Sequence, residues 1–259
     1  MIILLRGHIR TSFNDNRLYS FIKLLCNTYK DIEIYIHTWD IIQNNISWRQ
    51  IEKKQVLITN NIINNYFKEC SKYIKNIIID DDKLITLNGN IDGKIVGSLC
   101  PLIGWKNYWY GQYQIIDYIN NSIINKNKFI LNLRFDIFCN PHSFTERDII
   151  MFVNQHYHTK NTLIENKFLY NDFFLGCDNC FIGDVKTMYK LIHHFHFNLD
   201  NILKRYKNIV HQEGLVMIEN SILFNSSNKI GINDVVNYGN RHHKLKTFQF
   251  INNKMQKIN

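Results

Sequence analysis

No stretch of this 259-residue chain approaches the ~20 consecutive apolar residues that a membrane-spanning helix requires. The apolar run at residues 1–6 is too short for a secretory signal peptide, and its positive charge comes after the run instead of before it. We therefore expect a soluble, cytoplasmic protein that associates at most peripherally with the inner face of a membrane.

The sequence has little cysteine, and what it has shows no framework. Its six cysteines are scattered, which at this length is typical of reduced thiols in an intracellular protein. One CxxC pair occurs, Cys177 and Cys180, but no second pair follows at a matching spacing. A zinc site of the usual four-ligand kind is therefore not expected.

The glycine-rich nucleotide fingerprints are missing from the first turn. Arg6-Gly7 follows an apolar run, but the residues around it match neither GxGxxG nor GxxxxGK[ST]. The sequence therefore gives no support to a dinucleotide-binding or a P-loop site at this turn. The turn still places Gly7 between two cations, Arg6 and Arg10, ahead of an expected helix whose N-terminus favours anions. It could hold a diphosphate, or it could be a surface loop with solvated arginines.

The bulk composition indicates one folded domain with an anionic partner. Hydrophobic residues make up 45% of the chain, and the formal net charge is +9. Nucleotides, phospholipid head groups and nucleic acid all carry complementary charge.

Hydrophobic periodicity predicts an α/β fold with a mostly parallel central sheet flanked by helices. We expect strands at residues 2–5, 31–40, 77–82, 129–138, 149–153 and 171–182, and helices at 16–29, 41–72, 105–125 and 184–197. The glycine-containing segment 83–104 is expected to be irregular.

The run at residues 129–138 is the strongest candidate for a buried central strand, and it carries Arg134 and Asp136 near its end. Charge at that place must be paired, or must face water or a ligand. Ligands of open α/β sheets bind beyond the carboxyl ends of the strands. Asp136 could therefore hold a divalent metal beside a phosphate-binding Arg134, or the two could form an internal ion pair.

Further polar and aromatic residues fall near the same expected edge. His37 and Trp39 end the second expected strand, and three acids at 80–82 end the third and form an alternative metal-binding group. Gln112 lies in an aromatic segment, 105–113, that could stack on sugar or base rings. Glu213 precedes a helix-like run, where it could act as a general base or simply complement the helix dipole.

Together these stretches resemble a family of bacterial and viral glycosyltransferase-like proteins with a GT-A-type, nucleotide-sugar-binding fold. The resemblance rests on an ordered set of segments at 4–11, 34–40, 47–49, 108–113, 133–136, 178–183 and 211–213. Two departures stand out. Arg134 occupies the place of the first aspartate of a DxD motif, and the segment at 211–213 lacks the proline of the family's His-Pro-Glu element.

The resemblance implies a single domain over residues 1–259, with a nucleotide-binding half at about 1–140, an acceptor half at about 141–240 and a basic tail at 241–259. It implies sugar transfer from a UDP- or GDP-type donor to a glycan or lipid-linked acceptor in surface polysaccharide or glycoconjugate synthesis. Asp136 would bind Mg²⁺ or Mn²⁺ and Glu213 would be the base of an inverting reaction. Arg6, Gly7, Arg10, His37, Trp39, Gln112 and Arg134 would bind the donor. The alternatives are an inactive protein of the same fold that binds a partner, and a basic nucleic-acid-binding protein.

Overall fold

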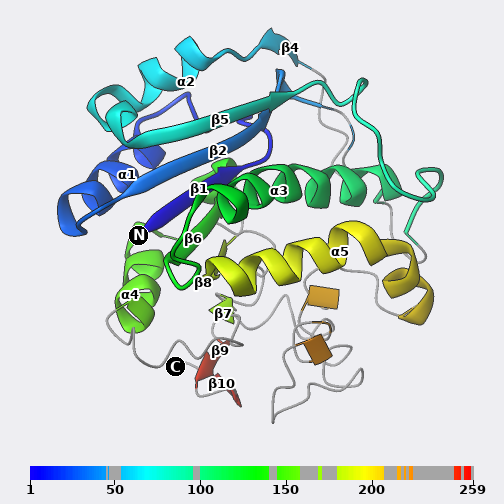
Figure 1. Ribbon diagram of the computed structural model, residues 1–259. Coiled ribbons are helices and arrows are strands. Elements are labelled where there is room, and N and C mark those ends of the chain that lie inside the picture. Colours follow the sequence, from blue (N-terminus) through cyan, green and yellow to red (C-terminus); the bar gives the residue numbers. More distant parts are fainter. Residues whose placement is uncertain are drawn as a thin grey trace.

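The computed structural model describes residues 1–44, 46, 54–95, 100–139, 145–157, 169–170, 180–206, 215–216, 219, 222–223, 248–251 and 254–257. Its centre is a six-stranded sheet with the strand order β5-β2-β1-β6-β8-β7 (Figure 1). The strands are β1 (Ile2–Arg6), β2 (Glu33–Trp39), β5 (Ile74–Asp80), β6 (Phe129–Arg134), β7 (Leu169–Tyr170) and β8 (Cys180–Asp184).

Four adjacent strands run parallel. β1 pairs in parallel with β2 on one side and with β6 on the other, and β5 extends β2 in parallel. β8 runs antiparallel to β6, and β7 antiparallel to β8. The expected α/β class with a mostly parallel central sheet is confirmed.

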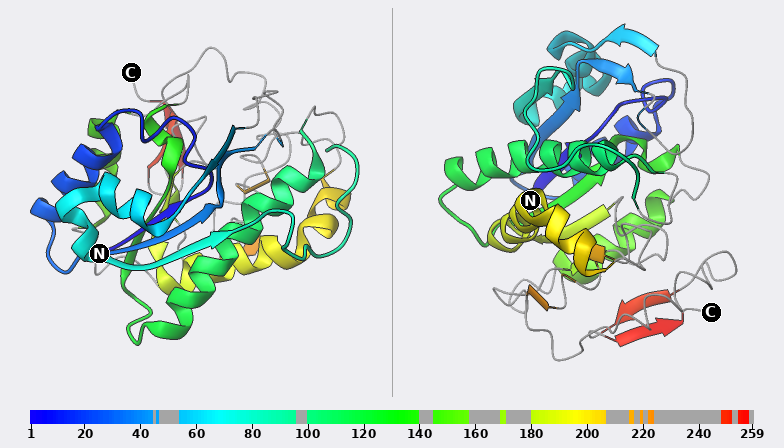
Figure 2. Two further views of the ribbon diagram at one scale, coloured as in Figure 1. Left: turned by 90° about the horizontal axis from the view of Figure 1, so that it is seen from above. Right: turned by 90° about the vertical axis from the view of Figure 1, so that its right-hand side faces the viewer.

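Helices cover both faces of this sheet (Figures 1 and 2). α3 (Leu102–Ser122) and α5 (Val185–Arg205) pack on one face, while α1 (Arg17–Thr28), α2 (Asn60–Phe67) and α4 (Glu146–Tyr157) pack on the other. Alternation along β1 explains the two cores, because Ile2 and Leu4 point to the α3/α5 side and Ile3 and Leu5 to the opposite side. All four side chains are fully buried, as expected for a central parallel strand.

Shorter elements complete the described chain. These are the antiparallel hairpins β3 (Ile41–Gln43) with β4 (Lys54–Leu57) and β9 (Phe248–Ile251) with β10 (Lys254–Lys257), and the 3₁₀ segments η1 (Lys68–Tyr73) and η2 (Phe135–Phe138). None of the described helices is long and apolar enough to cross a membrane.

Three expectations about single elements were wrong. Residues 149–153 belong to helix α4, where Ile149 and Val153 lie one helical turn apart and face the core. The segment 41–72 contains strands β3 and β4 as well as helix, and the central strand ends at Arg134 instead of at Phe138. The division of the domain at about residue 140 stays a prediction.

The described part of the loop between β5 and α3, residues 81–95 and 100–101, has little regular structure, as expected, but polar contacts hold it to α5. Lys106, which is 4% exposed, forms an ion pair with Asp200 at 2.7 Å and donates to the backbone oxygen of Asn88 at 2.7 Å. The backbone N–H of Asn90 donates to the same Asp200 carboxylate at 3.1 Å. Gly89, at φ +71°, lies so close to Asp200 that a side chain would collide with it.

Candidate functional site

The carboxyl ends of the four parallel strands meet at one edge of the sheet. In the register of the sheet, Arg6 at the end of β1 lies beside His37 of β2 and beside Arg134 of β6. Trp39 lies beside Asp80 at the end of β5. Residues that are more than 120 positions apart in the sequence therefore form one row, as the strand pattern predicted.

The centre of this row is a carboxylate between two arginines. Arg134 donates to Asp136 with two N–H groups, Nε to Oδ1 and a terminal nitrogen to Oδ2, both at 2.8 Å. Arg10 donates to Oδ2 at 2.6 Å. The Asp136 side chain is 7% exposed, and those of Arg134 and Arg10 are 17% and 20% exposed. The internal ion pair that the sequence left open is thus present, with a second arginine added.

The backbone after β1 places Arg10 at this carboxylate. Gly7 has φ +89°, its N–H donates to His37 O at 3.1 Å, and its carbonyl accepts from Thr38 Oγ1 at 3.0 Å. Arg10 itself has φ +53°, an uncommon conformation for a residue with a side chain, and its N–H donates to Ile42 O at 2.8 Å. A Cβ built on Gly7 meets no atom within 4 Å. The turn therefore borders open space.

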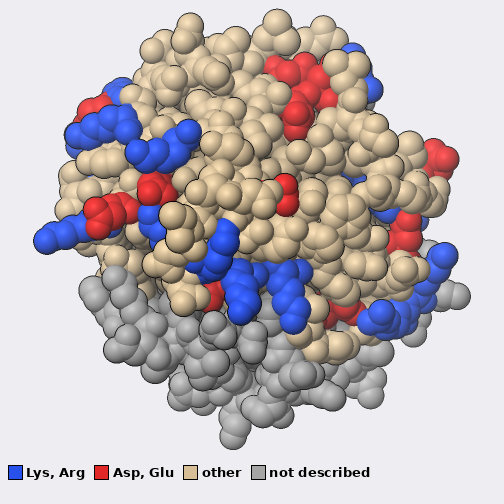
Figure 3. All heavy atoms as spheres, in the orientation of Figure 1, with Lys and Arg blue, Asp and Glu red and all other residues tan. Residues whose placement is uncertain are grey.

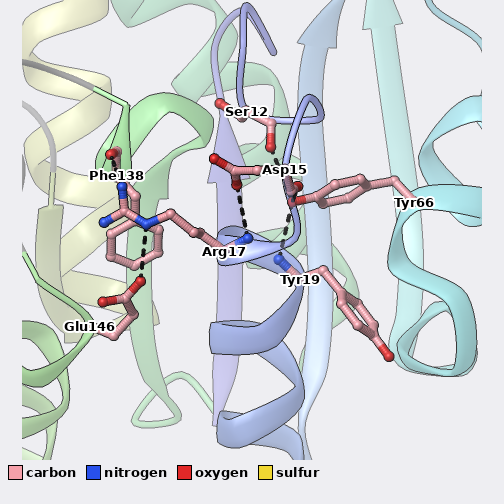
Figure 4. A network of polar contacts seen from close by, with 7 residues as sticks. All are labelled: Ser12, Asp15, Arg17, Tyr19, Tyr66, Phe138 and Glu146. Atoms are coloured by element: carbon pink, nitrogen blue, oxygen red, sulfur yellow. Dashed lines mark hydrogen bonds and ion pairs between the residues drawn. The ribbon is translucent and has the colours of Figure 1, made fainter.

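The rest of this loop is held from both sides (Figure 4). Tyr66 of α2 donates from its hydroxyl toward the carbonyl oxygens of Ser12 and Asp15, at 3.1 and 3.0 Å. On the other side, Arg17 donates to Phe138 O at 2.8 Å and to Glu146 at 3.3 Å. The loop that carries Arg10 is therefore tied both to α2 and to the segment that carries Asp136.

Arg6 lies deeper than the other two arginines. It is 2% exposed, donates from Nε to Asn132 Oδ1 at 2.7 Å and packs on the ring of Tyr108 at 4.8 Å. Asn132 in turn donates to Gln112 Oε1 at 3.1 Å, and Gln112 is fully buried. Arg6 and Gln112 were expected to touch the donor. Their burial instead makes them supports beneath the edge, linking β1, β6 and α3.

His37 is also fully buried, so the expected direct contact with a ligand is not what this structure shows. Its Nε2 lies 3.1 Å from Asp80 Oδ2 and donates to that carboxylate, which orients it. Its other face lies against Gly111 of α3, where only the absence of a Cβ makes room for the ring. Burial raises the pKa of Tyr110 to about 12, and the negative charge of Asp80 and a hydrogen bond to it add to this rise.

Trp39 is 4% exposed, and two partly exposed rings pack against it. Tyr110 stacks on it with centroids 6.2 Å apart, and His8 lies at 5.8 Å. Tyr110 belongs to the aromatic segment 105–113 that was expected to stack on rings, whereas His8 and Asn132 were not singled out by the sequence analysis. An asparagine inside an otherwise apolar strand was the one signal that could have revealed Asn132.

The donor set at Asp136 does not fit a divalent metal. Three guanidinium N–H groups already occupy its two oxygens. With an effective dielectric constant of about 20, a carboxylate ~2.2 Å away attracts a divalent ion by roughly 15 kcal/mol, and two guanidinium groups ~5 Å away repel it by roughly 13 kcal/mol. The two energies nearly cancel before the ion loses any hydration water. Within the described chain, no three His, Cys, Asp or Glu side chains group as metal ligands.

The other expected metal group, at 80–82, does not gather its carboxylates either. Asp80 accepts from His37, and Asp82 accepts from the Asn44 side chain. The expected base Glu213 and the segment 47–49 lie outside the described residues. Their roles stay predictions.

His8 provides a pH test of this edge. Burial, and next the charge of Arg10, lower the pKa of His8 from 6.5 to about 3. As the pH falls, His8 therefore becomes protonated in the unfolded chain before it does in the folded protein. The contribution of neutral His8 to stability is complete above about pH 6.5 and is lost as the pH falls toward 3. We expect the free energy of unfolding to fall by about 1 to 2 kcal/mol between pH 7 and pH 5 on account of His8.

Urea denaturation of the wild type and of His8→Asn at both pH values measures this difference. The variant should show a smaller loss. Some pH dependence will remain, since burial also lowers the pKa of His196, to about 4. An equal loss in both proteins would contradict a neutral His8 at pH 7.

No family model matches the sequence, and no curated protein matches it. Among solved structures, the chain is similar to the crystal structure of an active-site mutant of LgtC, with a TM-score of 0.42 and 9% sequence identity. The similarity covers 86% of this chain and 69% of that one. A likeness of this size assigns neither a family nor an activity to the chain.

Proposed function

We propose that this protein transfers a sugar from a nucleotide-sugar donor to a glycan or lipid-linked acceptor. One observation carries the proposal: two arginines, Arg10 and Arg134, share one carboxylate at the carboxyl edge of a parallel sheet. This is the edge at which open α/β sheets bind their ligands. The donor's pyrophosphate is the anionic part that two guanidinium groups recognise.

The surroundings of the arginine pair suit a nucleotide. Gly7 borders open space next to Arg6 and ahead of Arg10, so a phosphate can approach the backbone there. Tyr110 of α3 and His8 of the loop after β1 present partly exposed rings next to Trp39, at the end of β2. A planar base stacks favourably on such rings.

The proposed chemistry assigns a role to each end of the broken bond. As the glycosidic bond to the diphosphate breaks, negative charge grows on the leaving oxygen, and Arg10 and Arg134 stabilise that charge. The anomeric carbon passes through an oxocarbenium-like state, by analogy with glycoside hydrolysis. Glu213 takes the proton of the attacking acceptor hydroxyl, and attack from the face opposite the leaving group inverts the configuration.

A thermal-shift screen with UDP, GDP, CMP and dTDP tests the binding half of the proposal. We expect one nucleotide, at about 100 times its Kd, to raise the melting temperature by roughly 5 °C or more, because it binds only the folded state. Arg134→Gln should remove most of this shift. Arg147→Gln, which changes an exposed arginine of α4, should keep it. A screen in which no nucleotide shifts the melting temperature would contradict the proposal.

Release of free sugar or nucleotide from a panel of nucleotide sugars tests the catalytic half. An enzyme hydrolyses its donor slowly when no acceptor is present, whereas an inactive protein of the same fold binds the nucleotide without turnover. Glu213→Gln should lose transfer to an acceptor and keep the thermal shift. Full activity in this variant would remove the base assignment alone.

The nucleic-acid alternative predicts a continuous basic stripe. On the face seen in Figure 3, Lys and Arg form several separate groups with Asp and Glu among them. The described residues on this face therefore form no continuous basic stripe.

A further inference from the structure

We infer that the donor's diphosphate is bound without a divalent cation, by Arg10 and Arg134, with Asp136 as the residue that positions both. The inference rests on the proposed function and specifies how the same site neutralises its substrate. It departs from the expectation that Asp136 holds Mg²⁺ or Mn²⁺.

The first step concerns the lone pairs of Asp136. A carboxylate offers about four acceptor directions. Arg134 Nε takes one on Oδ1, and Arg134 and Arg10 each take one on Oδ2. Three of the four directions are therefore used by charge-assisted contacts, and a metal ion that bound both oxygens would have to displace at least one of them.

The second step concerns net charge. Arg10 and Arg134 bring two positive charges into contact with the single negative charge of Asp136, and Arg6 lies beside Arg134 in the register of the sheet. The pKa of His8 is lowered by burial, so its ring adds no charge at neutral pH. The arginines therefore already supply the positive charge that a metal ion would otherwise bring to a diphosphate.

The third step concerns access. The side chains of Arg10 and Arg134 are 20% and 17% exposed, whereas that of Asp136 is 7% exposed. A guanidinium carries five N–H groups, so contact with Asp136 and contact with a phosphate are compatible. The two arginines are therefore more accessible to a ligand than the carboxylate between them.

The fourth step concerns alternative metal ligands. Asp80 is held by His37 Nε2, and Asp82 receives the Asn44 amide. Neither hydrogen bond involves Asp136. Over the part of the chain that the structure describes, no group of three or more such ligands forms.

Calorimetric titration of the nucleoside diphosphate chosen by the screen tests the inference, once with EDTA and once with Mn²⁺. A titration of Mn²⁺ into the nucleotide alone corrects for the complex they form in solution. We expect the two Kd values to agree within about threefold, which is under 1 kcal/mol. Arg10→Gln should raise Kd about tenfold or more in both buffers, because a charge-assisted hydrogen bond is lost.

Asp136→Asn separates a positioning carboxylate from a metal ligand. This variant keeps the shape and the acceptor oxygen, so the ratio of the Kd values with and without Mn²⁺ should stay the same as in the wild type. Arg147→Gln is the control for a change of surface charge.

The outcomes are distinct. Binding that EDTA abolishes in the wild type, or a Mn²⁺ effect that Asp136→Asn removes, would overturn the inference and leave the proposed function standing. Absence of nucleotide binding in both buffers would overturn both.

Discussion

Replacing Asp136 with alanine should lower the free energy of unfolding by about 3 kcal/mol, because it leaves two arginine side chains that are only 20% and 17% exposed without their shared carboxylate. The same change should reduce sugar transfer by about 100-fold or more. Arg10 and Arg134 would lose the contacts that fix their directions, and misplaced groups stabilise a developing charge poorly. Urea denaturation and initial-rate measurements give the two quantities.

Glu146→Ala is the matched control, because it also removes a carboxylate from an arginine. The Arg17–Glu146 pair is 46% and 39% exposed, with N and O 3.3 Å apart. Its loss should cost less than about 1 kcal/mol, since water screens such a pair. Similar costs for Asp136→Ala and Glu146→Ala would show that the arginine cluster contributes little to folding. Undiminished transfer by Asp136→Ala would remove the core of the proposed mechanism.

Replacing Gly111 with alanine should lower the free energy of unfolding by about 2 kcal/mol or more. An added Cβ meets His37 Nδ1 at 2.5 Å, with Cε1 of the same ring closer still. The ring cannot step aside, because Asp80 holds its Nε2 and Trp39 lies edge-on at 5.2 Å. Overpacking of a core costs about 1 to 3 kcal/mol or more, which outweighs the gain of up to about 1 kcal/mol in helix propensity.

Gly104→Ala in the same helix provides the comparison. The nearest atom to its added Cβ is Ile46 Cγ2 at 3.5 Å, an ordinary contact. We expect this variant to gain up to about 1 kcal/mol, so the two alanine substitutions should move the melting temperature in opposite directions. If Gly111→Ala is as stable as the wild type, then α3 does not press on His37 as described.

The parallel core was predictable because its strands are nearly continuous apolar runs. β1, β2, β5 and β6 were all expected close to where they lie, and the shared edge followed from their direction. The strand predicted at residues 149–153 was wrong because its apolar run is short. A short apolar run fits a buried strand and one face of a helix equally well, and only the packing of Ile149 and Val153 decides between them.

The site was predictable in position but not in detail. Sequence placed Arg10, Arg134 and Asp136 at one edge, but it could not say that a second arginine would reach the carboxylate, since that depends on the left-handed backbone of Arg10. It also could not tell exposed from buried polar groups. His37 and Gln112 are polar residues on elements that touch the edge, and the packing of α3 over β2 and β6 places both inside.

The described part of the loop that joins β5 to α3 has an irregular backbone, yet side-chain contacts hold it in place. Lys106 and Asp200 anchor it from two different helices, so amide hydrogens near Asn90 are shielded by fixed partners and not by a repeating ladder. Hydrogen exchange there should be slower than the absence of secondary structure suggests. Any tilt of α5 would therefore pull on the part of the loop around Asn90 through the contact with Asp200.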